Sequence, residues 1–160
     1  MATQINRYLW NLKTPWFIIL MTIATFVIII PLDFILPEIS KNPVTQETVL
    51  LQIILAVFWA PLSETLIFQV FLFWILRCIP WIREKDILII VIASIIFGLS
   101  HQFGIIYIVG VVLIGLLYNY AYWLYEKKNE KADVTMSAFW VVFWIHLLHN
   151  LITLLISNFG

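Results

Sequence analysis

Long apolar stretches separated by short polar loops dominate this sequence of 160 residues. Hydrophobic residues make up 63% of the chain and charged residues 11%, whereas soluble domains average about 45–50% and about 25%. A soluble protein of this size has too little interior to hide so much apolar surface from water. We therefore expect the lipid bilayer to be the solvent. The length allows about five transmembrane helices of roughly 20 residues each.

Polar loops divide the chain into one interfacial segment and five predicted spans. Residues 1–15 carry apolar side chains at helical spacing, which predicts a short amphipathic helix on the membrane surface. The expected fold is an all-α polytopic membrane protein, with residues 1–160 as a single transmembrane domain. The second span is long, so we expect it to tilt, to kink at Pro61 or to project from the membrane. The predicted spans are residues 16–36, 48–77, 87–102, 105–125 and 138–157.

Positive charges are distributed unevenly between the two sides of these spans. Eight of the nine Lys and Arg residues precede the first span or lie in the loops after the second and fourth spans, and only Lys41 lies on the other side. The positive-inside rule therefore predicts a cytoplasmic N-terminus. Nine acidic residues balance the nine basic ones, so charge indicates no nucleic-acid partner. We expect an integral protein of a bacterial cytoplasmic membrane, of unknown oligomeric state.

A few ionisable side chains lie where a membrane span should be apolar. Glu64 is the only acidic residue well inside a predicted span, and the three histidines, His101, His146 and His149, lie in spans or at their ends. Such groups are costly to bury in a membrane and are candidates for function. A rise of 1.5 Å per residue places Glu64, His101 and Asn150 each about 20 Å from the cytoplasmic side, and His146 about 14 Å.

This polar layer suits the hydrolysis of a peptide bond. A carboxylate in low-dielectric surroundings is a good general base toward water, and a histidine can hold that water or protonate the leaving amine. His146 and Asn150 share a helix face and can donate hydrogen bonds to the developing oxyanion. Structural interpretations also fit: a neutral Glu64 carboxyl, an interfacial His101 ring, and a link between helices from His146 and Asn150. His149 is expected to pack against or support the site.

Three short motifs, in order along the chain, are similar to those of one membrane-protease family. Residues 60–69 read APLSETLIFQ, residues 97–101 read FGLSH and residues 146–150 read HLLHN. They resemble the first motif, the FxxxH motif and the HxxxN motif of the CPBP family, the CAAX-type and bacteriocin-processing membrane proteases also called Abi proteins. The resemblance covers residues 48–155, which we expect to form the catalytic core.

The resemblance implies an intramembrane endopeptidase that activates water with a glutamate and a histidine and without a metal. By position in the motifs, Glu64 would be the base and His101 its partner. His146 and Asn150 would form the pair that binds the oxyanion or orients the substrate. The expected partners are the lipid bilayer and a membrane-associated peptide or protein substrate, either prenylated or carrying a leader.

The first motif departs from the family pattern at two positions. The family usually reads EExxxR, and here Thr65 and Gln69 stand in place of the second Glu and the Arg. Both replacements remove a charge and lie four apart on one helix face, so a neutral Thr–Gln pair is expected to replace an ion pair. Activity is expected to survive. Together with Phe68, Phe97 and His149, these two residues are expected to support the site.

Other functions fit the same residues. The missing Glu and Arg favour a non-catalytic relative that binds a peptide or bacteriocin, with an immunity or scaffold role. No cofactor is expected, but Glu64, His101 and His146, with His149 as a further candidate, offer the ligand types of a zinc site. Serines beside Glu64 and His101 would allow a serine nucleophile, but no third orienting group is evident in the sequence.

Overall fold

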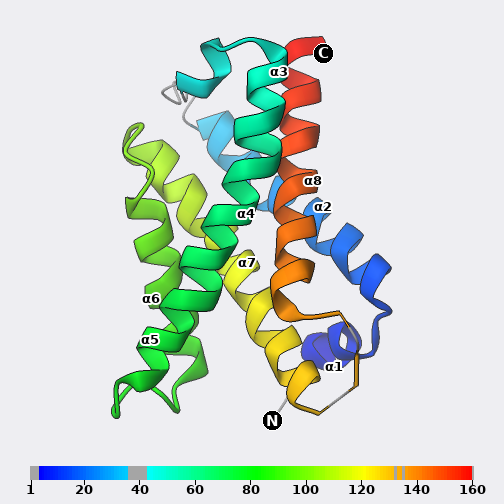
Figure 1. Cartoon of the computed structure of the whole chain (residues 1–160), viewed down its shortest axis with the longest axis vertical. Helices are drawn as coiled ribbons and strands as arrows, with labels where there is room; N and C mark the ends of the chain where they lie inside the picture. The colour runs from blue at the N-terminus through cyan, green and yellow to red at the C-terminus, as the bar shows by residue number, and fades with distance from the viewer. Residues whose placement is uncertain (1–3, 36–42, 132, 135, 160) are drawn as a thin grey trace.

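The computed structural model describes residues 4–35, 43–131, 133–134 and 136–159, and every regular element in these ranges is a helix (Figure 1). A short helix, α1 (Gln4–Asn11), precedes the first long helix, α2 (Thr14–Ile35). In chain order the other elements are η1 (Pro43–Gln46), α3 (Val49–Gln52), η2 (Ile53–Trp59), α4 (Ala60–Glu64), η3 (Thr65–Phe71), α5 (Leu72–Cys78), α6 (Asp86–Leu99), α7 (Ile105–Glu130) and α8 (Ala138–Phe159). The elements from α3 to α5 form one continuous helix.

Four of the helices are long and apolar enough to cross a membrane. They are Thr14–Leu32, Val49–Cys78, Ile105–Glu130 and Ala138–Asn158. A fifth apolar helix, α6, has only 14 residues and is about 21 Å long, short of the roughly 30 Å of a bilayer's hydrocarbon core. The predicted all-α polytopic membrane fold is confirmed, with four full-length helices and one short one among the described residues.

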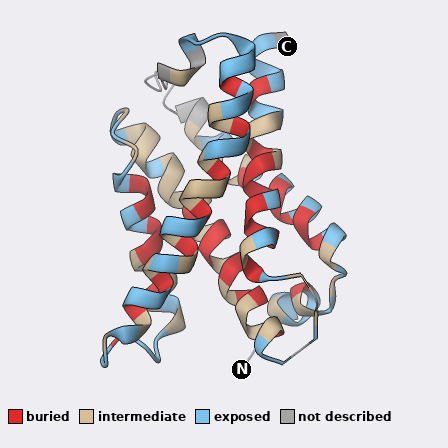
Figure 2. Ribbon diagram, viewed as in Figure 1, coloured by how far each residue is buried: buried red, intermediate tan, exposed pale blue. Residues whose placement is uncertain are grey.

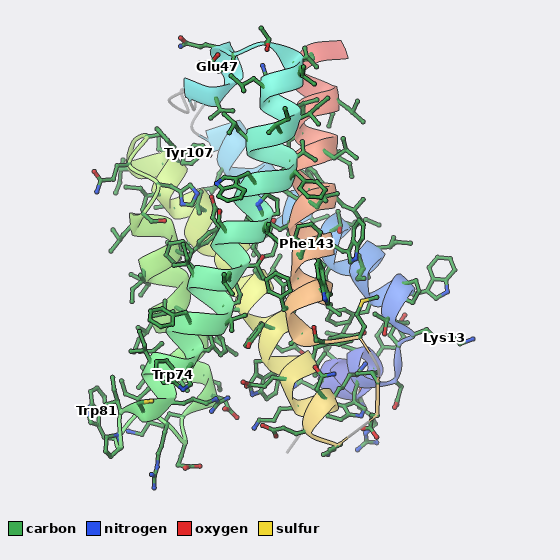
Figure 3. The ribbon with its side chains drawn as sticks, in the orientation of Figure 1. Lys13, Glu47, Trp74, Trp81, Tyr107 and Phe143 are labelled. Atoms are coloured by element: carbon green, nitrogen blue, oxygen red, sulfur yellow. The ribbon has the colours of Figure 1, made fainter. Side chains whose placement is uncertain are left out.

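The helices run alternately up and down, so the loops gather at two ends of the bundle (Figure 1). Helix α1, the α5–α6 turn and the α7–α8 connection lie at one end, with Lys13 and Trp81 (Figure 3). We call it the basic end, since eight of the nine Lys and Arg residues lie in the loops and helix ends here. The other end, with η1, the start of α3 and the end of α8, is called the distal end; Glu47 lies there.

The hydrophobic core lies toward the basic end and joins α2, α5, α6, α7 and α8 (Figure 2). An ion cluster fastens three of these helices, because Arg77 Nη2 lies 3.0 Å from both Asp86 Oδ1 and Glu126 Oε2. Lys128 is 2% exposed, and its Nζ lies 4.6 Å from the centre of the Tyr125 ring. Helix α7 therefore extends to Glu130 rather than to the predicted end at residue 125, since its charged last turns pack instead of forming a solvated loop.

Small residues allow α6 and α7 to cross closely. A Cβ at Gly98 would lie 2.2 Å from Val112 Cγ2, and a Cβ at Gly115 would lie 2.9 Å from Phe97 Cδ1. Gly104, which ends the α6–α7 turn, has a φ of 117°, a conformation that side chains with a Cβ disfavour. These glycines hold the turn that carries His101 against the start of α7.

The second long helix accommodates Pro61 through widened turns on both sides of it. Segments η2 and η3 are π-helical, and α4 between them carries Pro61 and Glu64. The Ala60 amide donates to Leu55 O, and Pro61 has no N–H, so Ala56 O has lost both of its nearby backbone donors. Insertions of π-helix often occur at functional sites. The helix continues past Pro61, and Ala56 O needs a donor from elsewhere.

Candidate active site

Three side chains that are distant in the sequence meet at one carboxylate oxygen. Glu64 Oε2, at the end of α4, lies 3.7 Å from His101 Nε2 and 3.8 Å from His146 Nε2. His101 belongs to the turn after α6, and His146 belongs to α8. The two distances exceed a direct hydrogen bond, so neither imidazole is hydrogen-bonded directly to the carboxylate.

The backbone of α6 fixes how the His101 ring is presented. His101 Nδ1 lies 2.9 Å from Phe97 O, and because a carbonyl only accepts, Nδ1 carries the hydrogen. In the neutral ring, Nε2 then has a lone pair directed toward Glu64. An imidazole nitrogen and a carboxylate oxygen that both accept, 3.7 Å apart, fit a water that donates one hydrogen to each.

Aromatic rings pack against both histidines. His146 is 5% exposed, and its ring centre lies 4.7 Å from that of Tyr118. Phe97 contacts His101 and His146, with ring centres 4.9 Å and 6.3 Å away, and Phe68 packs on Phe97. This packing holds the two imidazoles in place. Within the described part of the chain, His146 Nδ1 has no hydrogen-bond partner.

Asn150 supplies the donor that Ala56 O lacks. Its Nδ2 donates to this carbonyl across 2.7 Å, so α8 stabilises the π-helical stretch that precedes Glu64. The amide keeps a second N–H, and Asn150 lines the same cavity as His146. The pair predicted to share a helix face therefore does so, with one Asn150 hydrogen committed to the scaffold.

His149 faces α2 through its hydrogen bond. The Thr25 hydroxyl lies 2.6 Å from Thr22 O, to which it donates, and 2.8 Å from His149 Nδ1. Since Thr25 uses its hydrogen on that carbonyl, His149 Nδ1–H is the donor in the second contact. The ring also stacks on Phe26, with centres 4.6 Å apart. These contacts anchor α8 to α2, beside the cavity that His149 helps to line.

The two positions that depart from the family motif are buried, but they do not form the expected pair. Gln69 Nε2 donates to Asn119 Oδ1 at 3.1 Å, and Asn119 Nδ2 donates to Ser94 Oγ at 2.9 Å. Among the described residues, Thr65 Oγ1 has no hydrogen-bond partner. A series of hydrogen bonds between uncharged side chains of η3, α7 and α6 therefore takes the place of an intrahelical pair. Sequence reasoning missed Asn119 and Ser94, although both are polar residues inside apolar spans.

A cavity of about 850 Å³ contains the whole cluster. Glu64, His101, His146 and Asn150 all line it, and most of its other lining residues are apolar. Tyr118, which sequence reasoning also missed, lines the cavity and packs against His146. Among the described residues, the wall of the cavity contains one Asp, Glu, Lys or Arg side chain, that of Glu64. A single carboxylate with flanking imidazoles in an apolar cavity is suited to proton transfer.

One protein-family model matches most of this chain. The family model described as type II CAAX prenyl endopeptidase, Rce1-like, matches residues 46–152, about two-thirds of the chain. The chain belongs to this Rce1-like family. Membership identifies an integral membrane protein of the CAAX-type intramembrane protease group, and the matched range includes all three motifs. No curated protein and no solved structure matches the chain.

The zinc alternative depends on how the possible ligands of this Rce1-like chain are arranged. Across the residues that the structure describes, no group of three or more His, Cys, Asp or Glu side chains is placed to hold a metal ion. The Nε2 atoms of His101 and His146 nevertheless face one Glu64 oxygen, and imidazole and carboxylate are zinc ligands. Metal binding stays a prediction for direct analysis.

Proposed function

We propose that this chain is an intramembrane endopeptidase that hydrolyses a peptide bond with water activated by Glu64 and His101. The observation that carries the proposal is the position of Glu64 Oε2, 3.7 Å from His101 Nε2 and 3.8 Å from His146 Nε2. The fixed Nδ1–H of His101 adds support, because it leaves two acceptors facing one water site. Membership of the Rce1-like family supports the same class of reaction.

The reaction follows from these positions. Water donates its hydrogens to Glu64 and to His101 Nε2; Glu64 takes one proton as the water oxygen attacks the carbonyl carbon. The oxyanion accepts hydrogen bonds from His146 Nε2–H and from the second N–H of Asn150. The proton on Glu64 then passes to the leaving nitrogen as the C–N bond breaks. The products are a carboxylic acid and an amine, and Glu64 is again ionised.

We propose a membrane-associated peptide, prenylated or carrying a leader, as the substrate. The largely apolar wall of the cavity favours a hydrophobic peptide segment, and its volume of about 850 Å³ accommodates several side chains. The description of the matched family names prenyl endopeptidases, which makes a prenylated peptide the first substrate to test.

The test compares substitutions in purified protein reconstituted into liposomes. The substrate is a farnesylated peptide ending in a CAAX sequence, and the same peptide without the lipid is assayed in parallel. Glu64→Gln and His101→Ala should each lower kcat by about 10²–10⁴-fold. Glu47→Gln, an exposed carboxylate at the distal end, is the matched control and should leave kcat unchanged. Full cleavage by both site variants would contradict the proposal.

A non-catalytic binding role is the second candidate, and the two altered motif positions favour it. Hydrogen bonds between the uncharged side chains of Gln69, Asn119 and Ser94 replace the charged residues of the family motif. A peptide-binding or bacteriocin-immunity protein would keep its biological effect in Glu64→Gln, whereas a protease would lose it.

Metal analysis of the pure protein tests the zinc alternative, which requires stoichiometric zinc and inhibition by a chelator.

A further inference from the structure

His149 has one ring nitrogen bound to the scaffold and one that is not. Its Nδ1–H donates to Thr25 Oγ1 at 2.8 Å, and the hydrogen of Thr25 goes to Thr22 O. In the neutral ring the other nitrogen, Nε2, then carries a lone pair and can only accept a hydrogen bond. Stacking on Phe26, with 26° between the ring planes, fixes the tilt of the imidazole. His149 therefore presents one acceptor in a set direction.

This acceptor is accessible from the cavity around Glu64. Within the described part of the chain, His149 Nε2 has no hydrogen-bond partner. The buried side-chain polar atoms that lack a partner there include His146 Nδ1 and Tyr118 Oη, but not His149 Nε2. An atom that has no partner and is not fully buried keeps some accessible surface. His149 is 7% exposed and lines the cavity, so Nε2 is open to a molecule that occupies it.

Helix α8 thus offers the cavity both donors and an acceptor. His146 Nε2–H and the second N–H of Asn150 are the donors of the proposed oxyanion contact. His149 directly precedes Asn150 and follows His146 by three positions, a spacing that places two Cβ atoms about 5–6 Å apart on a helix. All three side chains line the cavity. A peptide backbone has the complementary groups, because each C=O accepts and each N–H donates.

A peptide in this cavity needs acceptors for its N–H groups. The wall is largely apolar, so a bound peptide loses water from its backbone, and a buried N–H without an acceptor is strongly disfavoured. In an extended chain, the N–H and the C=O of one residue face the same neighbour. The residue whose carbonyl contacts His146 and Asn150 therefore directs its own N–H toward the same helix, where His149 lies.

We propose that His149 Nε2 accepts a hydrogen bond from the backbone N–H of the substrate residue on the N-terminal side of the scissile bond. Since this N–H and the attacked C=O belong to one residue, the contact aligns the peptide with Glu64. Thr25 is a positioning residue, because it keeps the ring hydrogen on Nδ1 and leaves Nε2 free to accept. The inference rests on the proposed protease function for the identity of the carbonyl, and on the contacts of His149 for the acceptor.

Backbone N-methylation of the substrate tests the contact, because it removes one N–H and leaves the side chains unchanged. The farnesylated CAAX peptide is prepared with a methyl group on one backbone nitrogen at a time, and mass spectrometry identifies the scissile bond. Methylation of the residue before this bond should lower kcat/KM of the unsubstituted chain about tenfold, mainly through KM. His149→Phe, which retains the stacking on Phe26, should show this loss with the parent peptide and no further loss with the methylated one.

Two more variants separate binding from structure. The side-chain oxygen of His149→Gln can accept a hydrogen bond and should recover part of kcat/KM for the parent peptide. Thr25→Val should raise KM, because the ring hydrogen is then free to move to Nε2. A purely structural His149 would instead lower the unfolding temperature and the cleavage of both peptides alike, which would contradict the inference. Equal sensitivity to methylation with and without His149→Phe would also overturn it, and would assign the N–H to another acceptor such as Asn150 Oδ1.

Binding measurements separate this inference from the proposed protease function. The Glu64→Gln chain in liposomes is titrated with fluorescent versions of the same peptide series. Its Kd should rise about tenfold for one methylated peptide, and this difference should vanish when His149→Phe is added. That result without any Glu64-dependent cleavage would support the contact and reject the protease. Glu64-dependent cleavage without the difference in Kd would reject the contact alone, and failure of every peptide to bind would reject it as well.

Discussion

The basic end and the cavity around Glu64 each hold partly buried charged side chains, but they use them differently. At the basic end, Arg77 Nη2 lies 3.0 Å from a carboxylate oxygen of Asp86 and of Glu126, and each contact is a formed hydrogen bond. In the cavity, Glu64 Oε2 lies 3.7 Å and 3.8 Å from its histidine partners, and neither contact is closed. The nitrogen–oxygen distances differ by less than 1 Å between the two places. This difference distinguishes a structural ion pair from a site that can admit a reactant.

This contrast predicts two classes of variants. Substitutions at the basic end should lower the free energy of unfolding and leave cleavage per folded molecule unchanged. Substitutions in the cavity cluster should lower cleavage and leave stability unchanged or higher, because functional polar groups are rarely optimal for folding. Four experiments test the separation.

Among these four variants, His146→Phe should have the largest effect, and it should affect cleavage alone. The phenyl ring retains packing on Tyr118 and removes the nitrogens of His146. Loss of one oxyanion donor should lower kcat by about 10²–10³-fold while the unfolding temperature stays the same. Trp144→Phe, an exposed aromatic residue two positions away, is the control and should change neither quantity. A matching drop in unfolding temperature would assign His146 to structure.

Gly98→Ala should lower both stability and cleavage. The α6–α7 crossing packs the two helices and also holds the turn that carries His101. The new Cβ would lie 2.2 Å from Val112 Cγ2 and 3.0 Å from Ile108 O, so the two helices must separate. We expect a loss of about 3 kcal/mol in unfolding free energy, measured by denaturant titration in detergent. Gly110→Ala, whose Cβ would meet Leu32 Cδ1 at 3.8 Å, should be nearly neutral. Equal results for both glycines would contradict the close crossing.

Gln69→Leu tests the buried polar chain below the site. It leaves the Asn119 amide oxygen without its donor, and a buried unsatisfied group lowers stability by about 2 kcal/mol. The double variant Gln69→Leu/Asn119→Leu should recover part of this loss, because both partners are then apolar. Unfolding temperatures of the two single variants and the double variant give the coupling. Simple additivity of the losses would argue against the interaction.

Arg77→Gln should have the smallest of the four effects. The ion cluster is partly exposed, with 26% of the Arg77 side chain accessible, so solvent weakens it and we expect a loss of about 1 kcal/mol. Cleavage per folded molecule should stay at the level of the unsubstituted chain. Arg83→Gln, which removes a more exposed pair with Glu84, should have no measurable effect on either quantity. Reduced kcat in Arg77→Gln would show that the basic end and the cavity are coupled.

The sequence predicted the helices well because each span has an apolar stretch bounded by charged or polar loops. It also predicted a polar layer at a common depth, since helical rise converts residue number into depth. The structure shows that Glu64, His101 and His146 of that layer are neighbours. Their catalytic roles stay predictions.

Other features depend on how the helices rotate and pack, which no single stretch of sequence determines. The π-helical turns around Pro61 free Ala56 O, and only their register explains why Asn150 binds backbone. The Gln69–Asn119 contact joins residues 50 positions apart, and His149 meets Thr25 across 124 positions. Charged residues near Glu126 suggested a loop, but Glu126 pairs with Arg77 of α5 and Lys128 is buried, so α7 continues.

The brevity of α6 has a consequence for the lipid around the protein. A helix about 21 Å long beside four full-length ones creates a hydrophobic mismatch on one side of the bundle. We expect the bilayer to thin next to the α6–α7 turn, drawing lipid headgroups toward the level of the site. The rate of the proposed cleavage should then depend on the length of the lipid acyl chains. Stiff membranes with long acyl chains should resist this thinning. Membrane composition would thereby change the rate of the proposed cleavage without any ligand.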